Sequence, residues 1–175
     1  MEKVLRIILP LLALVLAYLI YQTIARPVKE QQRIERREDE TKKRLLQIKA
    51  AQFAFKNRHS VFAEDFNVLL NALKTDKVPV VRQDSVRSDS GIRVIYDTSW
   101  IPMFRVAFPE GNVYIDSLPY VPESGGTRFV LNAGLIEKNM TMVPVFEVYD
   151  PKPYKDGMSL RLGSMTEAVF SGNWE

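Results

Sequence analysis

Residues 45–56 read LLQIKAAQFAFK, and this stretch decides the fold. The spacing of Lys49, Gln52 and Lys56 places them on one narrow stripe of an α-helix, while the rest of the helix surface is apolar. A helix of this kind is mostly enclosed by other parts of its protein. We therefore expect a central helix that forms the spine of the core. The expected core residues on it are Leu45, Leu46, Ile48, Phe53 and Phe55.

Downstream of this helix, the pattern predicts a short second helix and then strands. KNRHS at residues 56–60 interrupts the apolar pattern, and Phe66, Leu69, Leu70 and Leu73 mark a helix that begins near Glu64 or Asp65. Beyond Pro79, short β-prone runs alternate with glycine-containing turns. The expected strands are residues 92–96, 103–108, 113–118, 128–133, 145–149 and 159–162. Helices followed by a meander predict an α+β fold in which one antiparallel sheet packs on the long helix.

Upstream of the central helix, residues 7–25 read IILPLLALVLAYLIYQTIA and carry no charge. These 19 residues are long enough to cross a hydrocarbon core of roughly 30 Å. Eleven are Ile, Leu or Val, which together favour insertion by about 5 kcal/mol. A cleaved secretory signal is the alternative, because Lys3 and Arg6 precede the run. We expect a retained transmembrane helix, because the run exceeds the usual length of a signal core and no Ala-x-Ala site follows it.

A charged helical stalk is expected between the membrane and the domain, at residues 26–44. This segment has eight basic and five acidic residues, including three consecutive acid-to-base pairs four residues apart that begin at Glu38, Asp39 and Glu40. A solvated helix is the leading interpretation, and contact of its basic side with anionic lipid headgroups is the alternative. The expected organisation is an N-terminal tail and transmembrane helix at 1–25, the stalk at 26–44 and one α+β globular domain at 45–175.

Charge and composition bear on several classes of function. The stalk carries a charge of +3 and residues 1–6 carry +1, so the rest of a chain with net charge +3 is at −1, and nucleic-acid binding is unsupported. The chain has no cysteine, which excludes disulfides, thiolate metal sites and cysteine nucleophiles. Its one histidine, His59, is expected to interact with the carbonyls that end the long helix. We therefore expect no enzymatic activity, no catalytic, cofactor-binding or metal-binding residues, and no cofactor.

Two further features suggest sites at first sight. Gly125 and Gly126 lack the lysine and the spacing of a P-loop and indicate a turn. Asp84, Asp89 and Asp97 lie in a loop-rich stretch without the spacing of a calcium loop. A catalytic pair of carboxylates from distant residues stays open, because the fold can bring such residues together.

The aromatic residues are expected to pack in or against the core, with the option that some form an exposed patch for a partner. They include Trp100, Phe104, Phe108, Tyr114, Tyr120, Phe129, Phe146 and Tyr149. Trp174, next to the C-terminal residue, is the least expected in the core. We expect it to tie down the C-terminal tail or to contact a partner.

The order of the elements resembles the type IV pilin and type II secretion pseudopilin architecture. The local match is RLLQIKAAQFAFKNRHSVFAEDFNVLLNAL, residues 44–73, which is similar to the pilin segment where the long helix ends, an aromatic-containing turn follows and a short helix begins. The start, MEKVLRIILP, has neither the glycine of the prepilin processing motif nor a glutamate in the apolar run. The resemblance therefore implies a pilin-like envelope component that does not polymerise. PVFEVYD at 144–150 with the ending SGNWE is also similar to an uncharacterised envelope family of Bacteroidetes, which implies no function.

These observations lead to an expected function and location. We expect a non-catalytic, membrane-anchored structural or assembly component of a bacterial envelope system, whose partners are the lipid bilayer and other envelope proteins or copies of itself. The alternative is a membrane-tethered binding module for a small molecule, lipid or glycan. The basic stalk favours a cytoplasmic domain, whereas the pilin-like architecture favours the opposite side. We expect a single-pass protein of the inner membrane with a periplasmic C-terminal domain, because the basic N-terminal tail resists export and long domains translocate largely regardless of charge.

Overall fold

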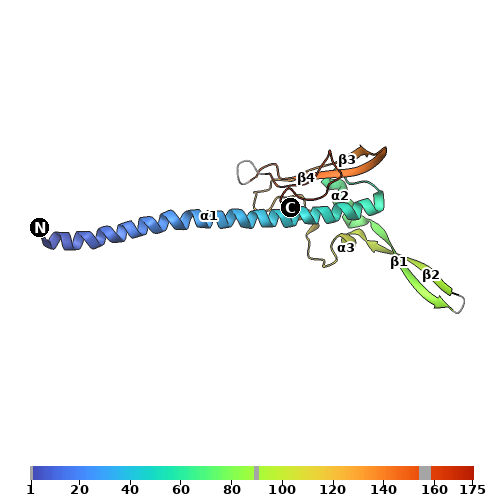
Figure 1. The fold of residues 1–175 in the computed structure, drawn as a ribbon, viewed down its shortest axis with the longest axis horizontal. Helices are drawn as coiled ribbons and strands as arrows, with labels where there is room; N and C mark the ends of the chain where they lie inside the picture. Colours follow the sequence, from blue (N-terminus) through green and yellow to red (C-terminus); the bar gives the residue numbers. More distant parts are fainter. Residues whose placement is uncertain (1, 89–90, 154–158) are drawn as a thin grey trace. The chain divides into compact units, whose positions relative to one another are not determined.

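A computed structural model describes residues 2–88, 91–153 and 159–175 of the chain. The protein has the expected α+β fold and divides into two compact units, Met1–Asp39 and Glu40–Glu175. Its helices are α1 (Glu2–His59), α2 (Phe66–Thr75), α3 (Met103–Ala107) and the 3-10 helix η1 (Ile115–Ser117). Its strands are β1 (Lys77–Ser88), β2 (Gly91–Pro102), β3 (Val130–Lys138), β4 (Thr141–Tyr149) and β5 (Arg161–Gly163), and Figure 1 labels the strands from β1 to β4.

The first unit consists of the N-terminal part of α1. Its large apolar side chains are exposed at Ile8, Leu9 and onward to Tyr21. Among the described residues, α1 is the one helix that is long and apolar enough near the N-terminus to cross a membrane, and none of its apolar window is buried inside the protein. By length and composition it is therefore a candidate for a single membrane span.

In the second unit, the C-terminal part of α1 forms the centre of the core. Its buried positions recur every three or four residues, as the enclosed face of a helix requires: they include Thr41, Leu45, Ile48, Gln52 and Phe55. The prediction of core residues is confirmed for Leu45, Ile48 and Phe55, and Phe53 packs against the core from a half-buried position. The prediction is wrong for Leu46, which is 44% exposed. Leu46 lies well away from the helix face on which Leu45, Ile48 and Gln52 fall.

The predicted polar stripe is also wrong at Gln52, whose side chain is fully buried. Its amide nitrogen donates a hydrogen bond to the carbonyl oxygen of Ala63, and its amide oxygen accepts one from the Ala63 nitrogen, both at 2.9 Å. The carboxamide thus pairs with a peptide as a neighbouring strand would. Because both polar groups are satisfied, Gln52 can lie in the core without the desolvation penalty of an unpaired group, and it fixes the turn that follows α1.

The end of α1 and the start of α2 agree with the sequence prediction. The helix α1 ends at His59, and Ser60 follows in the left-handed region at φ 64° with its nitrogen bonded to the carbonyl of Lys56. Asp65 caps the N-terminus of α2 by accepting a hydrogen bond of 2.7 Å from the Asn67 nitrogen. The local sequence signals that end α1 and cap α2 therefore predict both helix boundaries correctly.

The expectation of one sheet is wrong, because the strands form two separate antiparallel sheets. β1 and β2 make a two-stranded sheet that runs from the pair Lys77 and Pro102 to the pair Ser88 and Gly91. β3, β4 and β5 make a three-stranded sheet in that order, and its strands lie at or near the predicted ranges 128–133, 145–149 and 159–162. The range 92–96 lies within β2, so four of the six predicted strands are found.

The other two predicted strands are helical turns, and β1 is a strand that was not predicted. The predicted strand 103–108 is α3 from Met103 to Ala107, and these two end residues are both buried at a spacing of one helical turn. Residues 113–118 contain η1, to which α1 is tied by the guanidinium of Arg44, a donor to the carbonyl oxygen of Ser117 and, at 2.7 Å, to its hydroxyl. Partial burial lowers the pKa of Arg44. Short apolar runs do not distinguish a strand from a helical turn, which explains both errors.

The three-stranded sheet packs on the C-terminal part of α1, as predicted. Phe146 in β4 is fully buried, and its ring lies 6.5 Å from that of Phe53 in α1 and 4.7 Å from that of Phe62. Gly163 in β5, at φ 81°, lies so close to Phe146 that a Cβ would stand 2.2 Å from the Phe146 carbonyl oxygen. The sheet, the helix and the turn after it therefore share one aromatic core.

Candidate interaction surface

The β1–β2 hairpin carries a face that is mostly exposed, which α1 contacts at Trp100 through Arg58. Residues paired across an antiparallel sheet project to the same side, and successive pairs alternate between the two sides. Three alternate pairs therefore share one face, which we call the hairpin face: Pro79 with Trp100, Val81 with Thr98, and Gln83 with Tyr96. The opposite side carries Val78, which is buried in the core, so the hairpin face is directed away from it.

The six residues of the hairpin face are mostly apolar or aromatic and carry no charge, and Lys77, which pairs with Pro102, follows the Trp100 row on the same side. Val81 is 58% exposed, Tyr96 67% and Trp100 55%, although large side chains of these kinds are usually covered in a monomer. None of its six residues is ionisable at neutral pH, whereas Arg82 and Asp97 form a pair on the opposite side of the same strands. Aromatic residues are enriched and charged residues are depleted at the centres of protein interfaces. The composition of this face is therefore that of an interface core.

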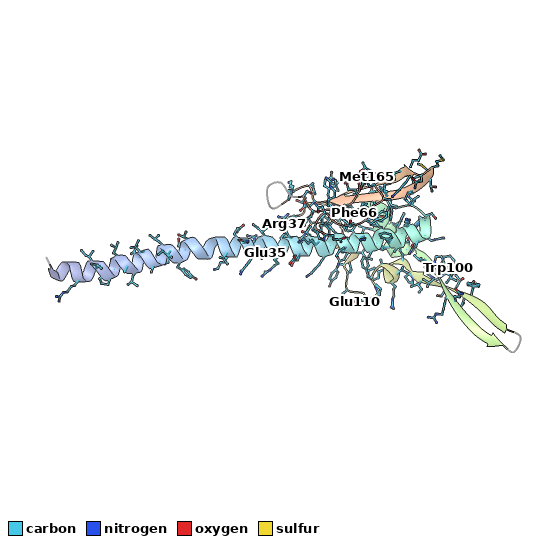
Figure 2. All side chains as sticks on the ribbon, viewed as in Figure 1. Glu35, Arg37, Phe66, Trp100, Glu110 and Met165 are labelled. Carbon is cyan, nitrogen blue, oxygen red and sulfur yellow. The ribbon has the colours of Figure 1, made fainter. Side chains whose placement is uncertain are left out.

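Trp100 is held at the root of the hairpin, where Figure 2 labels it. The guanidinium of Arg58, in the last turn of α1, lies 5.5 Å from the centre of its ring. A cation over an indole is the most favourable of the cation–π arrangements. Just beyond β2, the nitrogen of Met103 donates a hydrogen bond of 2.9 Å to the carbonyl oxygen of Asp76, just before β1. The root of the hairpin is thus fixed, while the rows around Val81 and Tyr96 stay uncovered.

The structure gives His59 a partner that differs from the expected one. Its Nε2 lies 2.9 Å from a carboxylate oxygen of Asp76, and its ring stacks on Phe55 with the ring centres 4.2 Å apart. The hydrogen bond from His59 lowers the pKa of the Asp76 carboxyl, and the Thr75 hydroxyl acts in the same direction. The expectation that His59 interacts with helix carbonyls is therefore corrected. The pair joins the end of α1 to the residue that precedes β1, which is a structural connection between two elements.

The aromatic residues divide between the core and the surface. Phe108, Phe129 and Phe146 are buried, whereas Trp100, Tyr114 and Tyr120 are exposed, so core packing as the default is wrong for these three. The core rings form one cluster that Lys56 covers, with its ammonium 5.0 Å from the centre of the Phe62 ring. Tyr120 is exposed and accepts a hydrogen bond of 2.9 Å from the guanidinium of Arg128. Tertiary packing decides which of these rings are covered, and sequence alone does not contain this information.

Trp174 helps to fasten the C-terminal tail. It packs against the core, and its ring covers Gly172, where a Cβ would stand 2.4 Å from the indole. Gly172 pairs with Leu162 in an isolated bridge, and the nitrogen of Asn173 donates to the carbonyl of Arg161. The expectation that Trp174 ties down the tail fits these contacts.

The remaining residues that suggested sites do not come together. Gly125 and Gly126 lie in a turn at φ 70° and 99°, and the hydroxyl of Ser124 closes it with a hydrogen bond of 2.6 Å to the carbonyl of Val121. Asp84 and Asp97 belong to β1 and β2, and Asp89 lies outside the described residues. Within the described ranges, no three His, Asp or Glu side chains form a group that could hold a metal ion.

Comparison with known proteins yields no match. No family model, curated protein or solved structure is significantly similar to this chain.

Proposed function

We propose that this protein is a non-catalytic, single-pass assembly component of a bacterial envelope system, anchored in the inner membrane with a pilin-like C-terminal domain in the periplasm. The observation that carries this proposal is α1, one uninterrupted helix of 58 residues. Its N-terminal part is apolar and uncovered, and its C-terminal part is the centre of an α+β core. One helix that serves first as an anchor and then as the spine of a domain is the arrangement that the pilin resemblance implies.

The exposed hairpin face favours assembly over the alternative of a small-molecule binding module. Val81, Tyr96 and Trp100 are large apolar or aromatic side chains exposed next to one another. Exposed patches of this composition often mark sites of contact with another protein. A ligand site is instead concave and lined by apolar groups with a few convergent polar ones. The hairpin is an extended two-stranded ribbon and therefore suits contact with another protein.

Alkaline carbonate extraction tests the anchor. Leu14 and Leu16 are exposed near the middle of the apolar run, and a charged residue there opposes insertion by roughly 2.5–3.5 kcal/mol. Two such residues outweigh the total of about 5 kcal/mol that favours the span. We expect the parent chain and a Leu14→Ala, Leu16→Ala control to stay in the membrane pellet at full length, and the Leu14→Arg, Leu16→Arg variant to be extracted. A parent chain that is extracted, or that is shortened by cleavage after residue 25, would contradict the proposal.

Labelling of a single cysteine tests the side of the membrane. The chain has no cysteine, and Met140, between β3 and β4, is 97% exposed. In Met140→Cys, a membrane-impermeant maleimide applied to cells with a permeabilised outer barrier is expected to label the protein before lysis. Labelling only after the inner membrane is broken would place the domain in the cytoplasm and remove the pilin-like function.

A further inference from the structure

We propose that three basic residues in the first half of the stalk bind the headgroups of anionic phospholipids, in the leaflet from which α1 leaves the membrane. They are Lys29, Arg33 and Arg36, which we call the basic stripe. Arg37 is buried and is not part of it. This inference rests on the proposed function in one respect, because it requires residues 7–25 to span the membrane.

The positive charge of the stalk is concentrated next to the apolar run. Residues 26–37 contain five basic and two acidic residues, so this half carries the whole stalk charge of +3. Residues 38–44 contain three residues of each sign and are neutral. Both halves belong to α1, the same uninterrupted helix that contains the candidate span. The charge therefore lies at a defined distance from the end of the apolar run.

This distance matches the reach of a charged membrane surface. For a helix that leaves along the membrane normal, Lys29, Arg33 and Arg36 lie about 6, 12 and 16 Å beyond residue 25. The headgroup layer is roughly 5–7 Å thick, and the field of its charges extends about 8 Å further at physiological ionic strength. The basic stripe therefore lies within this field or at its limit, whereas Glu38 and the acidic residues after it lie roughly 20 Å away or more.

The three side chains of the stripe share one side of α1 and are exposed. Successive residues of a helix are rotated by about 100°, which places Lys29, Arg33 and Arg36 within about 60° of one another. The acidic residues of the same half, Glu30 and Glu35, lie about 90° and 130° from the middle of the stripe. Headgroup phosphates that approach this side therefore meet cations without an intervening carboxylate.

The two halves of the stalk differ in how their charges are compensated. Lys29 and Arg33 are four residues apart and Arg33 and Arg36 three, spacings at which like charges destabilise a helix. In the second half, the three acidic residues each precede a basic residue by four, which is the order that stabilises a helix. The second half therefore compensates its own charges, while the basic stripe gains from an anion outside the helix. The adjacent membrane supplies that anion as lipid phosphate, which lysine and arginine both bind.

Spin-labelled lipids test the binding with the full chain in vesicles of zwitterionic phosphatidylcholine. Electron spin resonance measures the fraction of a labelled lipid that the protein immobilises. Each basic residue near the surface strengthens the attraction about fivefold, and lipids on the uncharged sides of the helix dilute the average. We therefore expect the chain to immobilise phosphatidylglycerol at least about twofold better than phosphatidylcholine. In 1 M salt, where charges are screened beyond roughly 3 Å, most of this preference should disappear.

Two double variants with the same change in charge locate the contact. Lys29→Gln with Arg33→Gln should bring the ratio of the two immobilised lipids close to one. Lys42→Gln with Lys43→Gln removes two charges that lie about 26 Å beyond residue 25, outside the field of the headgroups, and should leave the ratio unchanged.

The other outcomes overturn the proposal. Equal immobilisation of the two lipids by the parent chain refutes it, and so does a preference that survives Lys29→Gln with Arg33→Gln. An equal loss of preference in both double variants would show that the net charge of the protein, rather than the basic stripe, attracts the lipid. If neither lipid is immobilised, the chain does not span the membrane and the anchor itself fails, whereas immobilisation without preference leaves the anchor in place and refutes the basic stripe alone.

Discussion

The second unit contains two antiparallel hairpins, of which β3–β4 packs on the core and β1–β2 is mostly exposed. β3–β4 pairs over nine residues in each strand and β1–β2 over twelve, both antiparallel. β4 gains β5 as a neighbour and buries Val145, Phe146 and Val148. No described residue adds a third strand to β1–β2, which leaves Val81, Tyr96 and Trp100 exposed. The difference teaches that apolar and aromatic strand residues do not by themselves mark the core. The position of a strand in the sheet decides whether they stabilise the monomer or remain available to a partner.

The largest expected effect on the free energy of unfolding comes from a substitution in the covered hairpin, β3–β4. Phe146→Ala leaves a cavity between β4 and α1, and the free energy of unfolding should fall by about 3–5 kcal/mol. Tyr96→Ala, the matched removal of an aromatic ring from the exposed hairpin, should change it by no more than about 0.5 kcal/mol. Urea titration followed by near-ultraviolet circular dichroism measures both. A comparable loss in the two variants would show that the β1–β2 face is packed within the monomer.

A smaller effect is expected at the tip of the covered hairpin. Asn139 and Met140 connect β3 to β4 at φ 51° and 60°, the positive angles of a type I′ turn. A side chain in this conformation costs about 1–2 kcal/mol, and the greater flexibility of glycine in the unfolded chain offsets roughly 0.5–1 kcal/mol of the gain from removing it. Met140→Gly should therefore stabilise the protein by about 0.5 kcal/mol in the same titration. Met142→Ala, at an exposed strand position, is the control for loss of the thioether alone, and equal effects of the two changes would refute the turn argument.

The smallest effect concerns the root of the exposed hairpin and depends on pH. Because the folded-state pKa of Asp76 lies below its ordinary value of 3.8, ionised Asp76 contributes stability that is present above about pH 4 and is lost as the pH falls through the folded-state pKa. The pair with His59 is partly exposed, so its contribution should be below about 1 kcal/mol. Asp76→Asn should thus be less stable than the parent at pH 5 to 6, with a gap that narrows in stronger acid. In a His59→Gln background this narrowing should largely disappear, and its persistence would assign the effect to other groups.

Features encoded in neighbouring residues were predictable, and features that depend on distant contacts were not. The end of α1, the cap of α2 at Asp65 and the strands at 128–133 and 145–149 follow from helical spacing, capping side chains and glycine turns. β1 was missed because Pro79 and its polar residues do not read as a strand, and only the absence of outer neighbours makes proline acceptable there. In the sequence Gln52 is only a polar residue of a helix, and its two hydrogen bonds to the backbone of Ala63 are visible only in the fold.

The aromatic residues of the exposed hairpin face were known from the sequence, but the location of that face was not predicted. The aromatic residues, Trp100 among them, were candidates for an exposed patch that binds a partner. The signal that could have located the patch is the alternation of Tyr96, Thr98 and Trp100, which puts them on one side of any strand through that segment. Val78 is buried while residues 80–83 and 96–99 are exposed, because only the root of the hairpin meets the rest of the unit, and no local pattern carries this information.

The pairing of Gln52 with Ala63 makes the second unit sensitive to a change as small as one amino group. Conversion of that carboxamide to a carboxylate, by spontaneous deamidation or by a single-base change that substitutes glutamate, would replace the donor to the Ala63 carbonyl with a second acceptor. It would also place a negative charge where no water reaches. Burial keeps the site from the water that deamidation needs, so the intact fold protects the side chain on which its first turn depends. The chemical lifetime of the protein is in this respect tied to how seldom the turn after α1 opens.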